Sequence, residues 1–321
     1  IDPCPDCGTG SLDFAWRAQQ AGHTVKFFQA STPHNENVGK GLIDRIDDFG
    51  KWLLWADLVL NVDPTGIPTL KDDSNVQLLE TGASNSMTIS MWVDTPPFDN
   101  IKVRQALKAA VDRQAMVDTV LLGFGETAAD NPVPLKSPAS FTTEAPKQDI
   151  ELAKKLLAEA GHPDGLKFDL FTAEGVPGMV RQAQVFAEMA RPAGFDINVV
   201  VTPAESYWDD VWLKKPIVTS AWSMRPPGEG LAVAYTQTAK WKETHWERPD
   251  YDALLLKANT TVDQAERIKL HQQVGKLLAD EGGVIIPMFV HQVLALRKGC
   301  TGYTPRAQNF NLNFEDLSCT K

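Results

Sequence analysis

The sequence predicts an α/β fold of two lobes that are joined by two crossings of the chain. Between residues 150 and 201, helical and strand patterns alternate with short connections, which is typical of a layered α/β unit. Two apolar strand patterns, at 86–93 and 284–296, bracket the middle of the chain and leave both terminal parts outside it. If the terminal parts pack together, these two strands link the lobes, and such an arrangement permits closure around a ligand.

The first part of the chain predicts three short strands and one amphipathic helix. VLNV at 59–62 and VQLL at 76–79 are apolar runs with turn residues between them, which favours strands. SMTISMWV at 86–93 alternates and predicts a third strand. Apolar residues then recur at helical spacing over 101–117, after an Asp-Asn pair that can cap the helix. The sequence therefore predicts one surface helix, followed by a loop at 123–138.

The second part of the chain predicts further helices and strands. Gly161 and Pro163 stop one helical pattern, and Pro192 and Gly194 stop the next. The predicted helices lie at 149–160, 179–190, 251–257 and 263–280. The predicted strands lie at 166–172, 195–201, 216–222 and 284–296, the last one interrupted at Pro287.

The composition is that of a globular protein with an acidic surface. Apolar residues make up 43% and charged residues 22% of 321 residues, which suits about two domains. The formal net charge of −10 argues against a nucleic-acid partner, which needs basic patches. No apolar run reaches the ~18–20 residues that cross a bilayer. The chain opens IDPCPDCGTG, from which targeting cannot be inferred.

The four cysteines form two close pairs in the sequence. Cys4 and Cys7 lie near one end, and Cys300 and Cys319 lie near the other. This even, clustered count favours disulfides in an oxidising compartment or plain thiols. A redox or metal site is the alternative, but Cys4 and Cys7 run into a glycine-rich stretch, and 19 positions separate Cys300 from Cys319.

No catalytic motif is present in the sequence. The serine hydrolase, zinc protease, P-loop and dinucleotide-binding patterns are all missing, and the six histidines lack metal-ligand spacing. The sequence therefore predicts no enzyme activity, no cofactor and no metal site. For His291, which lies in an apolar strand, we expect a structural hydrogen bond.

Tryptophans and one arginine are the best candidates for ligand contacts. Six of the nine tryptophans lie between residues 92 and 246, where they can line a cleft or fill the core. Trp222, Ser223 and Arg225 follow directly on the strand at 216–222, and α/β proteins place ligands at such strand ends. Arg225 suits a carboxylate or phosphate, although it can also pair with Glu229.

Several segments together resemble one protein family. They are PPFDNIKVRQALKAAVDRQAMVDTVLLGFG at 96–125, DNPVP at 130–134, DIELAKKLLAEAGHPDG at 149–165, WERPDYDALLLKA at 246–258 and DEGGVIIPMF at 280–289. In order and spacing they are similar to extracellular solute-binding proteins of family 5, the dipeptide-, oligopeptide- and nickel-binding class that serves ABC importers. The resemblance extends from about residue 57 to residue 302.

The resemblance implies a two-lobed periplasmic-binding-protein-like fold of type II, cluster C, with an inserted lobe joined by two hinge strands. Residues 1–90 would form a partial first lobe and hinge, and residues 91–284 the inserted α/β ligand-binding lobe. Residues 285–321 would form the return strand and the C-terminal tail of the first lobe. Family members carry a long N-terminal portion that this sequence lacks.

The resemblance also implies a ligand site and a function. Arg225 stands where peptide binders carry an acid for the peptide's α-amino group, so the ligand is expected to bear an anionic group. The implied ligand-binding residues are Trp222, Ser223, Arg225, Tyr207, Trp208, Gly175 and Met179.

We therefore expect a monomeric, periplasmic or lipid-anchored extracellular binding protein without catalytic activity. Its ligand would be a small polar solute, either a peptide or an anionic amino-acid derivative such as an opine, and metal chelates come next. Its partner would be an ABC permease in the inner membrane. The alternatives are a chaperone-like or scavenging peptide carrier and a hydrolase that uses Asp or His in the cleft.

Overall fold

The structure is a computed structural model and describes residues 15–16, 18–27, 41–46, 58–61, 70–304 and 318–319 of the 321-residue chain. The strands are β1 (Leu58–Asn61), β2 (Val76–Met91), β3 (Gly125–Thr127), β4 (Leu166–Thr172), β5 (Phe195–Val201), β6 (Ile217–Ser223), β7 (Val284–Arg297), β8 (Cys300–Thr301) and β9 (Ser318–Cys319). The longer helices are α3 (Ile101–Ala109), α4 (Arg113–Val120), α5 (Ile150–Glu159), α6 (Met179–Ala190), α9 (Pro249–Thr260) and α10 (Gln264–Glu281). The short helical turns are η3 (Arg191–Ala193), α7 (Ala204–Ser206), the π-helical η4 (Tyr207–Val211) and α8 (Pro227–Gly230).

One mixed sheet organises the described part of the chain. Its strands follow the order β1-β7-β2-β6-β4-β5, and β3 also pairs with β7. The strand pairs that involve β2 or β7 are antiparallel. β4 is parallel to both β5 and β6, and α6 provides the connection from β4 to β5 that a parallel pair requires.

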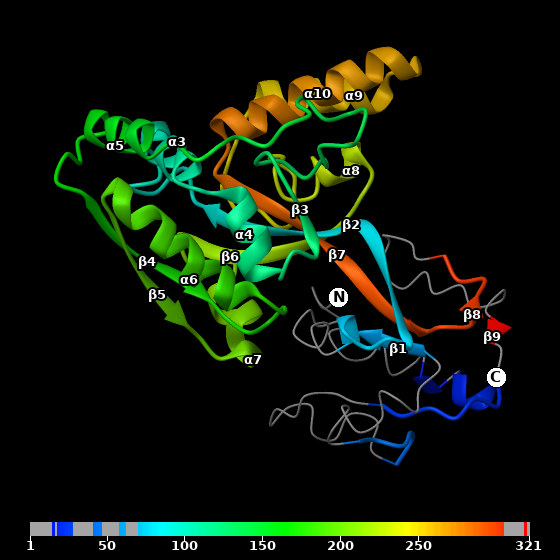
Figure 1. Cartoon of the computed structure of the whole chain (residues 1–321). Coiled ribbons are helices and arrows are strands. Elements are labelled where there is room, and N and C mark those ends of the chain that lie inside the picture. The colour runs from blue at the N-terminus through cyan, green and yellow to red at the C-terminus, as the bar shows by residue number, and fades with distance from the viewer. Residues whose placement is uncertain are drawn as a thin grey trace.

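Helices cover both faces of this sheet (Figure 1). Neighbouring residues of β7 point to opposite faces, so Ile285 joins a core with α3, α4 and α6 while Ile286 joins one with α9 and α10. Burying each large apolar side chain contributes roughly 1.5–3 kcal/mol, which is why a strand apolar on both faces belongs in the middle of the fold.

β2 and β7 continue together beyond the helices. Figure 1 shows both strands running away from the helical part toward β1, β8 and β9. A separate small core, made of Leu294, Leu296, Cys300 and Tyr303, lies at that end. Here the disulfide Cys300–Cys319 joins β8 to β9, which confirms the expected bond for this pair. Cys4 and Cys7 lie outside the described residues.

Two of the expected strands are one. β2 runs unbroken from Val76 to Met91, although we predicted separate strands at 76–79 and 86–93. Its pairing with β7 shifts register between Glu80 and Asn85, so bulges carry the strand through the stretch that contains Gly82. The polar, glycine-containing sequence that suggests a loop is therefore a bulged strand.

The predicted helix over 101–117 is two helices. α3 ends at Ala109, and α4 begins at Arg113 because the side chain of Asp112 accepts a hydrogen bond from the amide of Ala115 at 2.9 Å. Aspartate at an N-cap competes with helix continuation. Apolar residues keep their helical spacing from α3 into α4, because both helices pack on the same core.

β7 also passes through Pro287, where we expected an interruption. The register against β2 shifts between Met87 and Ile89, opposite Ile286 and Pro287. At a bulge, the residue need not donate its backbone N–H to the neighbouring strand. Proline, which has no N–H, therefore loses no hydrogen bond here. The expected loop at 123–138 likewise contains β3, which pairs with β7.

The elements of the middle segment match their predictions closely. α6, β4 and β5 have the predicted bounds, and α5 differs by one residue at each end. β6, α9 and α10 differ from their predicted bounds by one to three residues at each end.

Side chains of α3 cap the end of α10, a role that the surface-helix pattern of α3 does not reveal. Arg104 donates to the carbonyl of Glu281 at 2.7 Å, and Lys108 donates to the carbonyls of Ala279 and Gly282 at 2.6 and 2.9 Å. These carbonyls end α10, where a helix leaves acceptors unpaired and carries partial negative charge. Both cationic side chains are buried, so they cap α10 instead of facing solvent.

His291 connects three strands near the bulged part of β2. Its Nδ1 lies 2.6 Å from Oε1 of Glu80 on β2, and its Nε2 lies 3.5 Å from Oε2 of Glu126 on β3. Lys136 also contacts Glu126, at 3.0 Å. Burial lowers the pKa of His291, but the contacts with Glu126 and Glu80 raise the pKa by more, so it lies above its usual value.

This cluster predicts a defined dependence of stability on pH. A histidine whose pKa is raised by folding stabilises the fold fully below its unfolded pKa of about 6.5 and loses that contribution as pH rises through its folded pKa. The unfolding free energy of the wild type minus that of His291→Gln should therefore decrease as pH rises above about 6.5.

His271 provides the opposite control, because burial lowers its pKa. The corresponding difference for His271→Gln should increase as pH rises toward about 6.5. Denaturant unfolding of both variants between pH 5 and 9 gives the measurement. A difference for His291→Gln that does not change with pH would show that the histidine is not held as an imidazolium.

Candidate functional site

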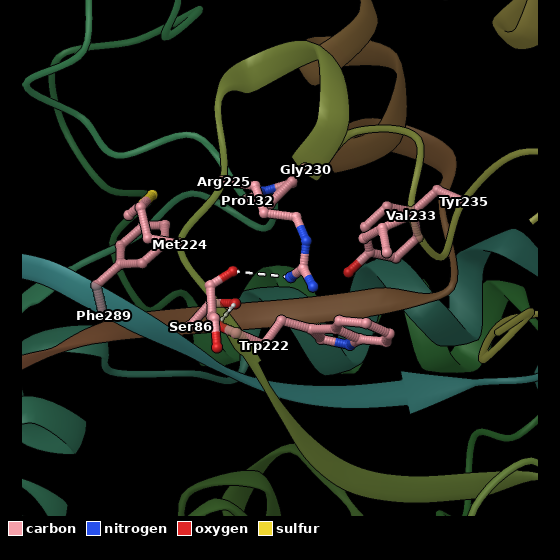
Figure 2. Close-up of a pocket in the computed structure, with 10 residues that line it drawn as sticks. Ser86, Pro132, Trp222, Met224, Arg225, Gly230, Val233, Tyr235 and Phe289 are labelled. Atoms are coloured by element: carbon pink, nitrogen blue, oxygen red, sulfur yellow. Dashed lines mark hydrogen bonds between the residues drawn. The ribbon is translucent and has the colours of Figure 1, made fainter. Parts of the chain in front are cut away.

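A small pocket lies at the carboxyl end of β6. Its cavity volume is about 10 Å³, which is room for about one water molecule and far below the ~300–1,000 Å³ of typical ligand pockets. Figure 2 shows its lining residues: Ser86, Pro132, Trp222, Ser223, Met224, Arg225, Gly230, Val233, Tyr235 and Phe289. The three residues predicted from the strand end, Trp222, Ser223 and Arg225, thus lie together in one pocket.

Arg225 is held in this pocket by three contacts. Nε donates to Oε1 of Glu229 at 3.0 Å, and Nη1 donates to the carbonyl of Ser223 at 3.0 Å. Its guanidinium carbon lies 5.5 Å from the ring centre of Trp222, across the pocket in Figure 2. Nη2 has no hydrogen-bond partner among the described residues. Arg225 therefore forms the expected pair with Glu229 and also lines a pocket, while its binding of an anionic group stays a prediction.

Apolar and aromatic groups complete the walls. Phe289, Met224 and Val233 supply carbon surface, and Tyr235 is almost fully buried. Burial, and then the negative charge of Glu243, raise the pKa of Tyr235 well above its usual value. The phenol of Tyr235 is therefore neutral at physiological pH. Among the residues that line the pocket, Arg225 supplies the formal charge.

An aromatic row leads from this pocket to the other predicted residues. The ring centres of Tyr207 and Trp208 lie 5.2 Å apart, those of Trp208 and Trp212 5.4 Å, and those of Trp212 and Trp222 6.2 Å. Trp241 continues the row, 5.7 Å from Trp222. Such edge and tilted contacts are favourable for aromatic pairs.

The remaining predicted residues take different places along this row. Gly175 lies against Trp208, and a Cβ at this glycine would approach the indole to 3.3 Å. Tyr207 is fully buried and donates to the carbonyl of Thr219 at 2.6 Å. Met179 is also fully buried, in the core at the start of α6. Tyr207 and Met179 thus support the site from the core and do not line the pocket.

Glu243 is the residue at this site that the sequence analysis missed. It is only 1% exposed, yet it lies directly behind Trp222. Its Oε2 accepts hydrogen bonds from Trp222 Nε1 and Ser90 Oγ, both at 3.0 Å. Its Oε1 accepts from Trp212 Nε1 and Ser220 Oγ, both at 2.5 Å. In the sequence it is one acidic residue in a polar stretch, WKET, and no local pattern distinguishes it.

Other kinds of site were not found in the described part of the chain. No group of three or more His, Cys, Asp or Glu side chains there could hold a metal ion. Among the same residues, no helix is long and apolar enough to cross a membrane.

Comparisons with known sequences agree on one group of proteins. Residues 56–243 match the profile of bacterial extracellular solute-binding proteins, family 5 middle. Heme-binding protein A of Haemophilus influenzae is 31% identical over 284 residues, which is 83% of this chain and 51% of that protein. Di/tripeptide-binding protein 1 of Pseudomonas aeruginosa is 26% identical, with the same two shares. The chain thus spans about half the length of these relatives.

Solved structures show the same fold. HbpA2 from Haemophilus parasuis has a TM-score of 0.75 at 24% identity, over 87% of this chain and 58% of that one. A dipeptide-binding protein from Pseudoalteromonas sp. SM9913, in complex with Met-Leu, has a TM-score of 0.71 at 21% identity, with the same shares. AgaA from A. tumefaciens R10, in complex with agropinic acid, has a TM-score of 0.66 at 21% identity, over 84% and 58%. The two-lobed, mixed α/β architecture predicted from the sequence is confirmed.

Proposed function

Because the chain belongs to the bacterial extracellular solute-binding proteins of family 5, we propose that it serves an ABC importer as part of its substrate-binding protein. It would bind a small polar solute outside the cytoplasmic membrane, in the periplasm or on a lipid anchor, and deliver it to the permease. The role is binding without catalysis, and the binding unit is a monomer. The relatives are named for heme and for di- and tripeptides, so membership leaves the solute class open.

We propose the same division of the chain that the sequence suggests. Residues 91–284 form the ligand-binding lobe, with 1–90 and 285–321 on the other side of the hinge. The pairing of β2 with β7, and their continuation past the helices toward β1, support this division. The pocket around Trp222 would then form part of the cleft wall that the ligand-binding lobe contributes.

The ligand we propose carries an anionic group that binds Arg225. The observation that carries this proposal is the guanidinium over Trp222, fixed by Glu229 and Ser223 and lining a pocket. Arginine prefers carboxylates, with which it forms charge-assisted hydrogen bonds. A peptide with its terminal carboxylate and an anionic amino-acid derivative such as an opine both satisfy this requirement. Structures of this fold hold a dipeptide in one case and agropinic acid in another.

Calorimetric titration of the purified 321-residue chain tests this proposal. The probes are the dipeptide Met-Leu, its C-terminal amide and the opine octopine. We expect at least one carboxylate probe to bind, and the amide of Met-Leu to bind at least about tenfold more weakly than Met-Leu if the peptide is the ligand. Equal binding of peptide and amide, or binding of none of the probes, contradicts the proposal. Indifferent binding of unrelated extended peptides would support the carrier alternative instead.

A further inference from the structure

We propose that Glu243 is a positioning residue of the ligand site: it fixes the indole of Trp222 and, through this ring, the place of the Arg225 guanidinium. The inference rests on the proposed function, since it assigns a role within the same site. Glu243 does not line the pocket, so it acts on a ligand only through Trp222.

The contacts of Glu243 define its chemical state. The indole N–H groups of Trp212 and Trp222 are donors only, and each of them meets a different oxygen of Glu243. Both oxygens therefore accept hydrogen bonds, and the hydroxyls of Ser90 and Ser220 complete the set. An ionised carboxylate, which accepts at both oxygens, fits this arrangement. No salt bridge to Glu243 occurs within the described ranges.

The four donors come from three parts of the fold, two of them from β6, which makes the anchor rigid. Ser90 lies on β2, Ser220 on β6 and Trp212 directly after η4, while Glu243 itself lies in the segment before α9. The two strands are also joined by the hydroxyls of Thr88 and Ser220 at 3.1 Å. A buried, fully paired polar network of this kind holds one geometry, because any displacement leaves a donor unpaired.

Glu243 therefore holds the edge of the Trp222 indole, while the face of the ring contacts Arg225. Nε1 is the single polar side-chain atom of Trp222, and this atom donates to Glu243. The guanidinium of Arg225 lies over its ring face. A carboxylate at the N–H polarises the indole and makes its face a better partner for a cation. The orientation of the ring and the position of the charge above it therefore both depend on Glu243.

Indole N–H resonances test the positioning without any ligand. In a 15N-labelled chain, Trp212→Phe and Trp222→Phe assign the two signals that belong to Glu243. In Glu243→Gln the amide oxygen can accept from only one of the two indoles, and in Glu243→Met the side chain accepts from neither, so we expect the Trp222 signal to move in Glu243→Met toward the position of solvent-bonded indoles. Circular dichroism confirms that both variants are folded. Glu188→Gln, which removes an exposed charge from α6, is the matched control and should leave both signals in place. An unchanged Trp222 signal in Glu243→Met overturns the proposal.

A double-mutant cycle tests the effect on binding, with Met-Leu as the probe. Glu243→Met, which keeps the length but has no oxygen acceptor, should weaken its binding about tenfold, the size expected for the loss of one buried hydrogen bond. In the Trp222→Phe background the same change should have almost no effect, because phenylalanine offers no N–H to Glu243. Independent, additive losses overturn the proposal. If the wild type does not bind Met-Leu, the proposed function fails for this probe, while the indole signals still decide the role of Glu243.

Discussion

Asp130→Ala is expected to lower the free energy of unfolding by about 3–5 kcal/mol, the typical cost of breaking a buried ion pair. Nη2 of Arg113 donates to Oδ2 of Asp130 at 2.5 Å, and their side chains are 2% and 5% exposed. Without Asp130, the guanidinium is buried with carbonyl acceptors but no negative charge. The same carboxylate also accepts from the amide of Ile286, at 3.1 Å, so the change removes a contact with β7 as well.

Denaturant unfolding followed by circular dichroism measures this effect. Asp196→Ala is the control, because Asp196 pairs with Lys167 on the surface, where solvent screens the charges. It should change stability far less than Asp130→Ala. Replacing both Arg113 and Asp130 with apolar residues of similar volume should recover part of the loss. A loss no greater than that of Asp196→Ala would show that the buried pair does not stabilise the fold.

Arg225→Gln is expected to weaken binding of a carboxylate-bearing probe by about 10- to 100-fold, since hydrogen bonds to charged groups contribute about 1.5–3 kcal/mol. Glutamine keeps polarity and part of the length but removes the charge and the planar fork. Stability should change little, because Arg225 and Glu229 form a partly exposed pair within four residues. Calorimetry with Met-Leu and octopine gives the measurement.

Glu229→Gln is the matched variant, and it should not weaken binding. It leaves Arg225 in place and removes the carboxylate that now neutralises it. The probe should therefore bind at least as tightly as it binds the wild type. If Arg225→Gln binds the probe as well as the wild type does, the anion-binding role of Arg225 is wrong, whatever the effect of Glu229→Gln.

Local signals explain why the middle of the chain was predictable. The side chain of Asp149 accepts from the amide of Leu152 at 2.8 Å and begins α5, and Gly161 follows its end with φ of 96°. Gly194, with φ of 99°, lets the chain turn directly into β5. These caps and stops depend on neighbours within a few residues, so the sequence alone contains them.

Contacts between distant residues explain the errors. Whether Gly82 and Pro287 interrupt their strands depends on the register between β2 and β7, whose residues are about 200 positions apart. Asp112 could continue a helix or cap one, and the packing of α4 decides this. Glu243 is joined to Ser90 across 153 positions, and no local pattern contains that contact.

The tryptophans show a similar limit. Trp212 and Trp246 are buried in the core, while Trp208, Trp222 and Trp241 remain partly exposed. Core filling thus applies to Trp212 and Trp246, whereas cleft lining stays a prediction for the partly exposed members. Only their positions in the fold separate them, since all of them carry the same amphipathic ring.

The ladder between β2 and β7 also determines how this two-stranded ribbon responds to force. The two strands are hydrogen-bonded neighbours over most of their length, from Val76 with Arg297 to Ser90 with Val284. Pulling one along the other loads many of these bonds in shear at once, whereas twisting the ribbon about its long axis breaks none of them. The ribbon is therefore expected to resist sliding of one strand along the other more strongly than it resists torsion.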